Sequence, residues 1–238
     1  MNAKMNVLAL ALLGLAGFAG SAVAGCPSSP VPPWTANNQF QGVTAIASPG
    51  LDGTPCRLDS TISAGASGFA SAIVEDDTPT AEPRYRASFM IDVDALTALG
   101  APGFTTVTTV FQGVSAVTGN GISLAIFGDG TNWLLSYTVV DAGDPSGYFS
   151  NSQPLGTGAR HVEFDLPVGA ASNFQIWIEN NVEGTPTATH TVNNAAIVGV
   201  DTAFLGLAAP SDGFTAAYSG TAAQFDRFDS RRSTFIGF

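Results

Sequence analysis

Basic residues are scarce in this sequence, and lysine is almost absent. The chain has eight Lys and Arg residues against nineteen Asp and Glu residues, and Lys4 is the single lysine. Binding of nucleic acid or anionic lipid needs clustered Lys and Arg, so the charge balance argues against both partners. The lack of lysine also excludes P-loop phosphate binding and Schiff-base chemistry. The net charge of −11 indicates solubility and is compatible with cation binding.

Long apolar runs are absent beyond residue 24, where no stretch approaches the roughly 20 apolar residues that a membrane-spanning helix needs. Residues 1–24 have the features of a signal peptide. Lys4 gives a positive start, residues 7–18 form a short apolar segment, and Ala22-Val23-Ala24 is a small-residue cleavage motif. We therefore expect an exported chain (periplasmic, cell-surface or secreted) without a membrane span.

Cysteine is limited to Cys26 and Cys56. In an exported chain the two can form a disulfide, which would tie the N-terminal segment to the first strand. The alternative is lipoprotein anchoring through Cys26, because Val23-Ala24-Gly25-Cys26 loosely matches a lipidation motif. Lipidation would leave Cys56 unpaired, and we favour the disulfide.

Helical periodicity is also scarce, and short alternating apolar and polar segments dominate instead. Asp94 can cap a single helical turn over residues 95–99. Residues 25–55, rich in Pro, Ser and Gly, are expected to form an extended arm, and residues 56–238 a single domain. About a dozen short strands and one helical turn predict an all-β fold of two antiparallel sheets packed face to face.

Residues 160–180 form the clearest candidate for a functional surface. Two alternating halves predict a hairpin that directs one face, including Phe164 and Ile176, into the core. The opposite face carries polar side chains and a tryptophan, and two arginines of an earlier alternating segment extend it. These candidate ligand-binding residues are His161, Glu163, Asp165, Gln175, Trp177, Glu179, Arg84 and Arg86.

The succession of segments is similar to a known fold. The segments YRASFMIDVDAL, LAIFGDG, HVEFDL with FQIWIEN, AAIVGVDTAFLG and AQFDRFDSRR resemble the concanavalin A-like, laminin G-like jelly-roll domain of exported bacterial proteins. The resemblance implies a two-sheet antiparallel jelly-roll sandwich. It implies little about activity, because this fold hosts lectins, adhesion modules, glycosidases and lyases. Glycosidases of the β-glucanase type carry a Glu-x-Asp-x-Glu strand, and here Glu163-Phe164-Asp165 lacks the third acid.

The polar face of the hairpin has the chemistry that sugar recognition needs. Trp177 offers an aromatic platform for sugar C–H groups, and Gln175 and Glu179 offer partners for hydroxyls. We therefore expect an exported, non-catalytic binding or adhesion module for glycan or another surface polymer. One alternative is a structural or matrix protein whose polar face is only the solvated side of a sheet. The other is a glycan-cleaving enzyme that uses Glu163 with Glu179 or Asp165 as a carboxylate pair.

Calcium is the one cofactor that the sequence leaves open. A Ca²⁺ ion needs six to eight converging oxygen ligands, and loop carboxylates such as Asp129, Asp141 and Asp144 are available. No EF-hand loop is present, and the spacing of these acids does not assign a site.

Overall fold

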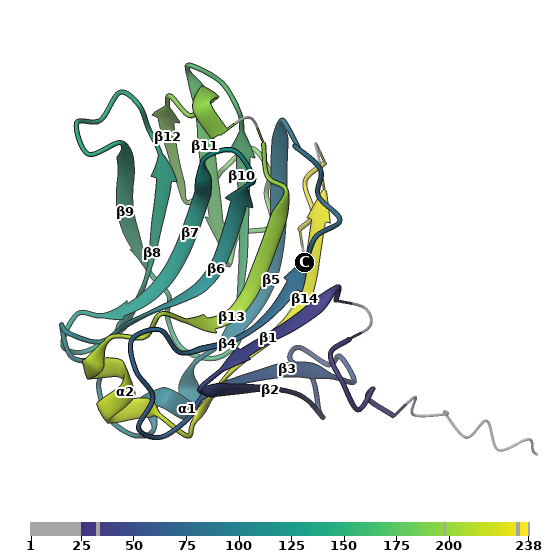
Figure 1. The fold of residues 1–238 in the computed structure, drawn as a ribbon, viewed down its shortest axis with the longest axis vertical. Coiled ribbons are helices and arrows are strands. Elements are labelled where there is room, and N and C mark those ends of the chain that lie inside the picture. Colours follow the sequence, from purple (N-terminus) through teal and green to yellow (C-terminus); the bar gives the residue numbers. More distant parts are fainter. Residues whose placement is uncertain (1–24, 32–33, 198, 232–233, 238) are drawn as a thin grey trace, which may run out of the picture.

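Two antiparallel β-sheets stack face to face in the computed structural model (Figure 1). The structure describes residues 25–31, 34–197, 199–231 and 234–237, so the expected signal peptide lies outside the described residues. Within these residues fourteen strands form two seven-stranded sheets, which we call sheet A and sheet B. The fold is a concanavalin A-like jelly-roll sandwich, as the resemblance implied.

Sheet A faces the viewer in Figure 1 and is ordered β1-β4-β13-β6-β7-β8-β9. Its strands are β1 (Ala36–Phe40), β4 (Ser71–Asp76), β13 (Thr202–Ala208), β6 (Val107–Ser115), β7 (Gly119–Gly128), β8 (Trp133–Val140) and β9 (Tyr148–Pro154).

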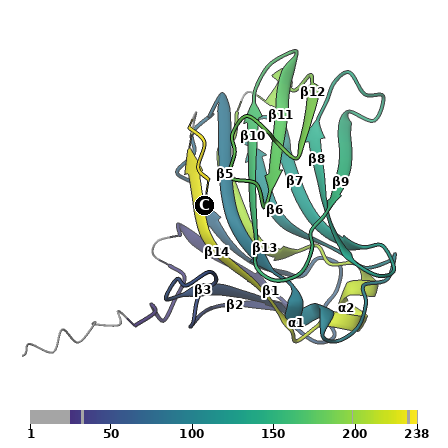
Figure 2. The same cartoon turned by 180° about the vertical axis from the view of Figure 1, so that it is seen from behind.

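Sheet B faces the viewer in Figure 2 and is ordered β12-β11-β10-β5-β14-β3-β2. Its strands are β12 (Ala188–Val192), β11 (Ser172–Ile178), β10 (Arg160–Pro167), β5 (Arg84–Asp92), β14 (Ala222–Arg231), β3 (Arg57–Ile62) and β2 (Gly42–Ala47). The remaining elements are the helices α1 (Asp94–Thr97) and α2 (Asp212–Tyr218) and the 3₁₀ turn η1 (Ala195–Ile197).

The hydrophobic core lies between the sheets and follows the alternation of the strands. Phe164 and Ile176 are cross-strand partners in the β10–β11 hairpin, and both are fully buried in the core. Phe111 of sheet A meets Phe164 edge to face, with 5.0 Å between ring centroids. The expected hairpin, and the side of it that enters the core, are therefore confirmed.

Two expectations are corrected by the structure. Residues 25–55 are not only an extended arm, because β1 and β2 lie within them and form an edge strand of each sheet. The helical turn at Asp94 is confirmed, but it is not alone. Helix α2 forms because the Ser211 hydroxyl caps it by accepting a hydrogen bond from the N–H of Phe214.

A disulfide between Cys26 and Cys56 joins the start of the described chain to the residue before β3. Both cysteines are therefore occupied, which favours the disulfide over lipidation of Cys26. Among the described residues, the helices are too short and too polar to cross a membrane.

Candidate functional site

The residues that the sequence singled out come together on the outer face of sheet B. Cross-strand pairing places Glu163 between Ser88 and Trp177, and Asp165 between Arg86 and Gln175. The alternation of β5, β10 and β11 therefore predicted the grouping of the side chains correctly.

The centre of this face is not open to solvent, contrary to the expectation of a ligand surface or a wet sheet side. At its margin Gln175 is half-buried, and the side chains of Arg84 and Glu179 are 41% and 38% exposed. Trp177 and Glu163 are fully buried, and Arg86 and His161 are almost so. Residues 179–187 cover one part of the face, where the indole N–H of Trp177 donates to the carbonyl of Val182 at 3.2 Å. Alternation along a strand indicates the side of the sheet to which a side chain points. It does not indicate whether another segment of the chain covers that side.

The second cover is formed by residues 234–237, which we call the strap. The main-chain N–H groups of Ile236 and Gly237 donate to the two carboxylate oxygens of Glu163, at 3.0 and 2.9 Å. The ring of Phe235 meets the Trp177 ring edge to face, with 5.5 Å between centroids. The guanidinium of Arg86 lies 4.7 Å from the Trp177 ring and 4.8 Å from the Phe235 ring.

Under these covers the charged side chains form an ion network that is buried at Arg86, Glu163 and Asp165. Its outer members Arg84 and Glu183 are 41% and 61% exposed. Arg86 Nε lies 2.6 Å from Glu163 Oε1, and Arg86 Nη1 lies 3.1 Å from Glu183 on the covering loop. Arg84 Nε donates to Asp165 at 2.9 Å, and this hydrogen bond raises the pKa of Arg84. A buried ion pair needs such partners, because each charge has lost its water. Nη2 of Arg86 is nevertheless buried without a hydrogen-bond partner among the described residues.

The proposed carboxylate pair of a glycan-cleaving enzyme is not available here. Glu163 is bound by Arg86 and by two main-chain N–H groups. Glu179 accepts a hydrogen bond from the main-chain N–H of His161 and lies 3.4 Å from Arg160 Nη1. His161 is buried on the same face, and desolvation lowers its pKa against the opposing pull of Glu163 and Glu179. No reactant can reach Glu163 while the strap is in place.

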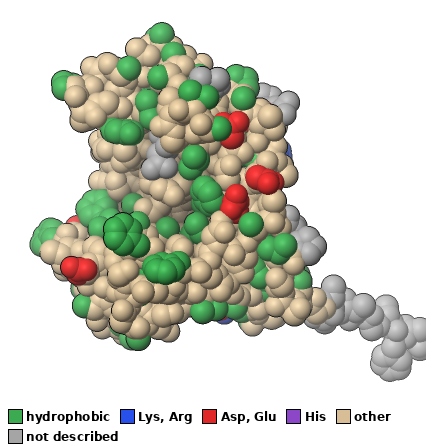
Figure 3. Space-filling view, in the orientation of Figure 1, with side chains coloured by type: hydrophobic (Ala, Val, Ile, Leu, Met, Phe, Trp, Pro, Cys, Tyr) green, Lys and Arg blue, Asp and Glu red, His purple; other side chains and the backbone are tan. Residues whose placement is uncertain are grey.

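The outer face of sheet A is a different surface, and the sequence reasoning missed it. Figure 3 shows that this side of the molecule is hollowed across its middle, and that it carries acidic but hardly any basic side chains. One cross-strand row runs over all seven strands of this groove. Its members are Ala36, Glu75, Phe204, Gln112, Ser123, Thr138 and Ser150.

The central members of this row are half-buried neutral hydrogen-bonding groups. Gln112, Ser123 and Thr138 are each partly accessible, and the hydroxyls of Thr138 and Ser150 lie 2.9 Å apart. Phe204 adds an aromatic ring at the β13 end of the row. The alternation of β6, β7 and β8 could have identified each outward residue, but the register that aligns them is set by the turns.

Charge is distributed unequally between the two sheets. Every arginine and histidine in the described part of the chain lies on a strand of sheet B. Glu75 is the charged member of the sheet A row, and it accepts a hydrogen bond from Asn38 on the neighbouring strand. The groove therefore offers hydroxyl, amide and apolar groups but no cation among the residues described.

Exposed apolar side chains border the groove at one end. Phe69 and Phe104 are 87% and 82% exposed, and Phe40 at the end of β1 is 54% exposed. Main-chain pairing places Phe40 opposite Ser71, beside Phe69, while the ring of Phe104 approaches Gly130 in the β7–β8 turn. We call these three phenylalanines the aromatic rim.

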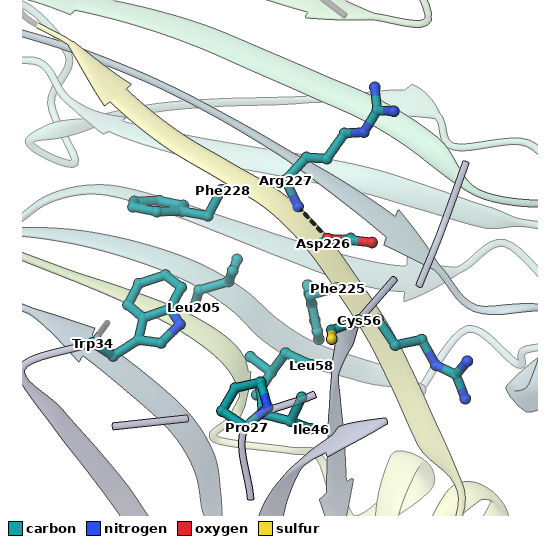
Figure 4. Close-up of a pocket in the computed structure, with 11 residues that line it drawn as sticks. Pro27, Trp34, Ile46, Cys56, Leu58, Leu205, Phe225, Asp226, Arg227 and Phe228 are labelled. Carbon is teal, nitrogen blue, oxygen red and sulfur yellow. Dashed lines mark hydrogen bonds between the residues drawn. The ribbon is translucent and has the colours of Figure 1, made fainter. Parts of the chain in front are cut away.

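A cavity of about 240 Å³ lies where the disulfide-tied segment meets the sandwich. Figure 4 shows Trp34, Leu58, Phe225 and Phe228 converging on it, while the side chain of Arg227 points away. Trp34 and Phe228 are in ring contact, with 4.7 Å between centroids. The largely apolar lining indicates packing of the N-terminal segment rather than recognition of a hydroxyl-rich ligand.

The described residues contain no group of three or more His, Cys, Asp or Glu side chains placed to hold a metal ion. Among the calcium candidates, Asp129 accepts hydrogen bonds from the N–H groups of Thr131 and Asn132, which lower its pKa. Asp141 accepts from the N–H groups of Gly143 and Asn193. Both acids thus serve to fix turns.

Comparison with known proteins finds similarity in structure only. No known protein family matches the sequence, and no curated protein is similar to it. An endo-β-1,4-glucuronan lyase from the fungus Trichoderma reesei superposes with a TM-score of 0.60 at 13% identity, covering 87% of this chain and 94% of that one. The marine alginate lyase of Zobellia galactanivorans gives 0.52 at 10% identity, with 82% and 83% covered. An alginate lyase from Pseudomonas aeruginosa gives 0.52 at 9%, with 80% and 86% covered. At these identities the similarity shows a shared fold.

Proposed function

We propose that the protein is an extracytoplasmic carbohydrate-binding protein that holds a neutral polysaccharide in the groove of sheet A. The observation that carries this proposal is the row of neutral polar side chains on a sheet that has no cation among its described residues. Sugars are recognised by a few placed polar groups next to apolar and aromatic surface, and this groove presents both.

The dimensions of the row suit a chain rather than a single sugar. From Phe204 on β13 to Ser150 on β9 it crosses four strand spacings, or roughly 19 Å at about 4.8 Å each. Gln112, Ser123 and Thr138 supply amide and hydroxyl groups along this length. The aromatic rim extends the apolar part of the surface beyond the edge of the groove.

The charge of the groove selects against acidic polymers. A polyuronate carries a carboxylate on every sugar. In a groove without cations these carboxylates would lose their water and gain no positive partner in return, which is unfavourable. The lyases of similar fold are named for glucuronan and alginate, so we expect this chain to differ from them in ligand. The disulfide supports a location in an oxidising compartment outside the cytoplasm.

Polysaccharide cleavage is the second candidate function, because the three similar structures are named as polysaccharide lyases. Their names favour cleavage over binding alone. Elimination needs a base that removes a proton next to a carboxylate, and cations or hydrogen-bond donors that stabilise the resulting charge. On the outward side of the described strands of sheet A, the ionisable groups are Glu75 and Tyr148. Glu75 is the better candidate for the base, because Tyr148 lies at the sheet edge.

The decisive experiment compares two glutamine variants on a glycan array. Gln112→Ala removes an amide from the sheet A groove, and Gln175→Ala removes an equally half-buried amide from the outer face of sheet B. We expect the wild type to retain neutral polysaccharides in preference to alginate and glucuronan. Gln112→Ala should weaken this binding at least about tenfold, because it removes one hydrogen bond between neutral groups in a desolvated site. Gln175→Ala should not change the binding.

Three outcomes decide between the functions. Binding that Gln112→Ala weakens and that leaves the polymer intact supports the proposal. Release of unsaturated or reducing ends, lost in Glu75→Gln, would replace it with cleavage. Absence of any binding by folded wild-type protein would refute both and favour the structural or matrix alternative.

A further inference from the structure

The strap meets sheet B by contacts that resemble those of a bound ligand more than those of a strand. It forms no ladder with β10 or β11, and its main chain reaches the sheet through the carboxylate of Glu163. The N–H groups of Ile236 and Gly237 point toward the same carboxylate, and Gly237 has φ of +68°, a left-handed conformation that glycine adopts at low cost. The strap also lays the ring of Phe235 against Trp177 and Arg86.

Beneath the strap lies a surface with the composition of a sugar site. Trp177 gives a flat indole, Glu163 gives two coplanar acceptor oxygens, and Arg86 gives a planar donor group. A cavity of about 260 Å³ adjoins them between the strap and the sheet. Its walls include Ser88, His161, Arg227, Asp229, Arg231, Ile236 and Gly237.

We propose that this surface is a second carbohydrate site, specific for a single sugar residue with two adjacent hydroxyls, which the strap keeps closed. Each group of the strap stands where a group of the sugar would bind. The N–H groups of Ile236 and Gly237 take the place of two adjacent hydroxyls on Glu163. The Phe235 ring, which meets Trp177 edge to face, takes the place of an apolar C–H edge of the sugar.

This site is distinct from the groove of sheet A, and the two lie on opposite outer faces of the sandwich. In this proposal the candidate residues expected from the sequence do bind a ligand, but only when the strap is displaced from the sheet. Because a ligand must displace the strap, its apparent affinity is reduced by the fraction of molecules in which the strap is open.

Gly237→Ala opens the strap without touching the sheet. An alanine at φ +68° is strained, and its Cβ would lie within 2.4 Å of the Asn181 side chain. Deletion of residues 234–238 is the second opening variant. The probes are the methyl glycosides of glucose, galactose and mannose, and binding is followed by ligand-observed NMR on protein whose folding is verified by circular dichroism.

We expect at least one methyl glycoside to bind both opening variants about tenfold or more tightly than the wild type. Trp177→Ala in the Gly237→Ala background should abolish that signal. Val117→Ala in the same background, at a 70% exposed position between β6 and β7, should not. A synthetic peptide of residues 233–238 should compete with the glycoside. Folded opening variants that bind no methyl glycoside would overturn the proposal, whatever the outcome for the sheet A groove.

Hydrogen exchange tests the opening in the unaltered chain, so the proposal does not depend on the variants folding. If the strap opens by itself, the amides of Ile236 and Gly237 exchange at least about 100-fold faster than those of Phe164 and Ile176 in the core hairpin. Exchange of the strap amides only with global unfolding would show that the strap is a fixed part of the sandwich, and would overturn the proposal.

Discussion

Replacing Glu163 by Gln should be among the most destabilising conservative changes in this protein. The side chain keeps its size, but Arg86 loses the charge that lies 2.6 Å from its Nε, while remaining 1% exposed. Removal of one partner from a buried ion pair costs about 3–5 kcal/mol, because the other charge is left in a poorly solvated site. Glu183 at 3.1 Å still offers partial compensation, so we expect a loss near the lower end, about 3 kcal/mol.

Equilibrium urea unfolding followed by tryptophan fluorescence measures this loss. The matched control is Asp229→Asn, which breaks the pair of Asp229 with Arg231, where both side chains are about 40% exposed. That pair should contribute no more than about 1 kcal/mol. The double variant Arg86→Met/Glu163→Leu lacks both charges, so no charge is left buried without its partner. It should be more stable than Glu163→Gln alone.

If Glu163→Gln and Asp229→Asn unfold at the same urea midpoint, the interior of this face is solvated and the strap does not seal it. A typical free energy of unfolding of about 5–15 kcal/mol exceeds the expected loss, so the variant should be folded enough for measurement.

Three further predictions concern stability. Cys26→Ser should lower the free energy of unfolding by about 3–4 kcal/mol, because the disulfide closes a loop with a sequence separation of 30; an unchanged denaturation midpoint would contradict this. Burial lowers the pKa of both His161 and His190, so the unfolded chain binds more protons than the folded one below about pH 6.5. Thermal stability should therefore fall as the pH drops from about 6.5 toward the lowered values, and it should fall less in His161→Gln. Gly206→Ala should destabilise the protein by more than about 2 kcal/mol, because φ is +126° and the new Cβ would lie 2.3 Å from a carbonyl oxygen of Ala72; a wild-type melting temperature would exclude that clash.

The sequence was sufficient for many of the strands beyond residue 55, and for the sides of the sheet on which their residues lie, but not for β1 and β2. Alternation depends on neighbouring residues alone, so Phe164 and Glu163 could be assigned to opposite faces of β10 without knowing the fold. Helix α2 was missed because seven residues make only two turns, too few for a helical period to stand out, although Ser211 followed by Asp212 is a helix-start signal that could have revealed it.

The site could not be predicted to the same extent. Glu163 and Ile236 are 73 residues apart, and nothing in the short strap sequence indicates where it docks. The row in sheet A combines β1, β4, β13, β6, β7, β8 and β9, so it depends on six registers and on the insertion of a late strand. Contacts of this range come from tertiary structure and leave no local pattern.

The position of the last two strands determines when this chain can fold. β13 lies between β4 and β6 in sheet A, and β14 lies between β5 and β3 in sheet B. Before residues 202–231 are available, each sheet is therefore divided into two parts whose facing edges have no partner. Folding of both sheets must follow synthesis of β13 and β14, and such non-local pairing is slow. During that interval the unpaired edges of β3 and β5 are open to pairing with other chains.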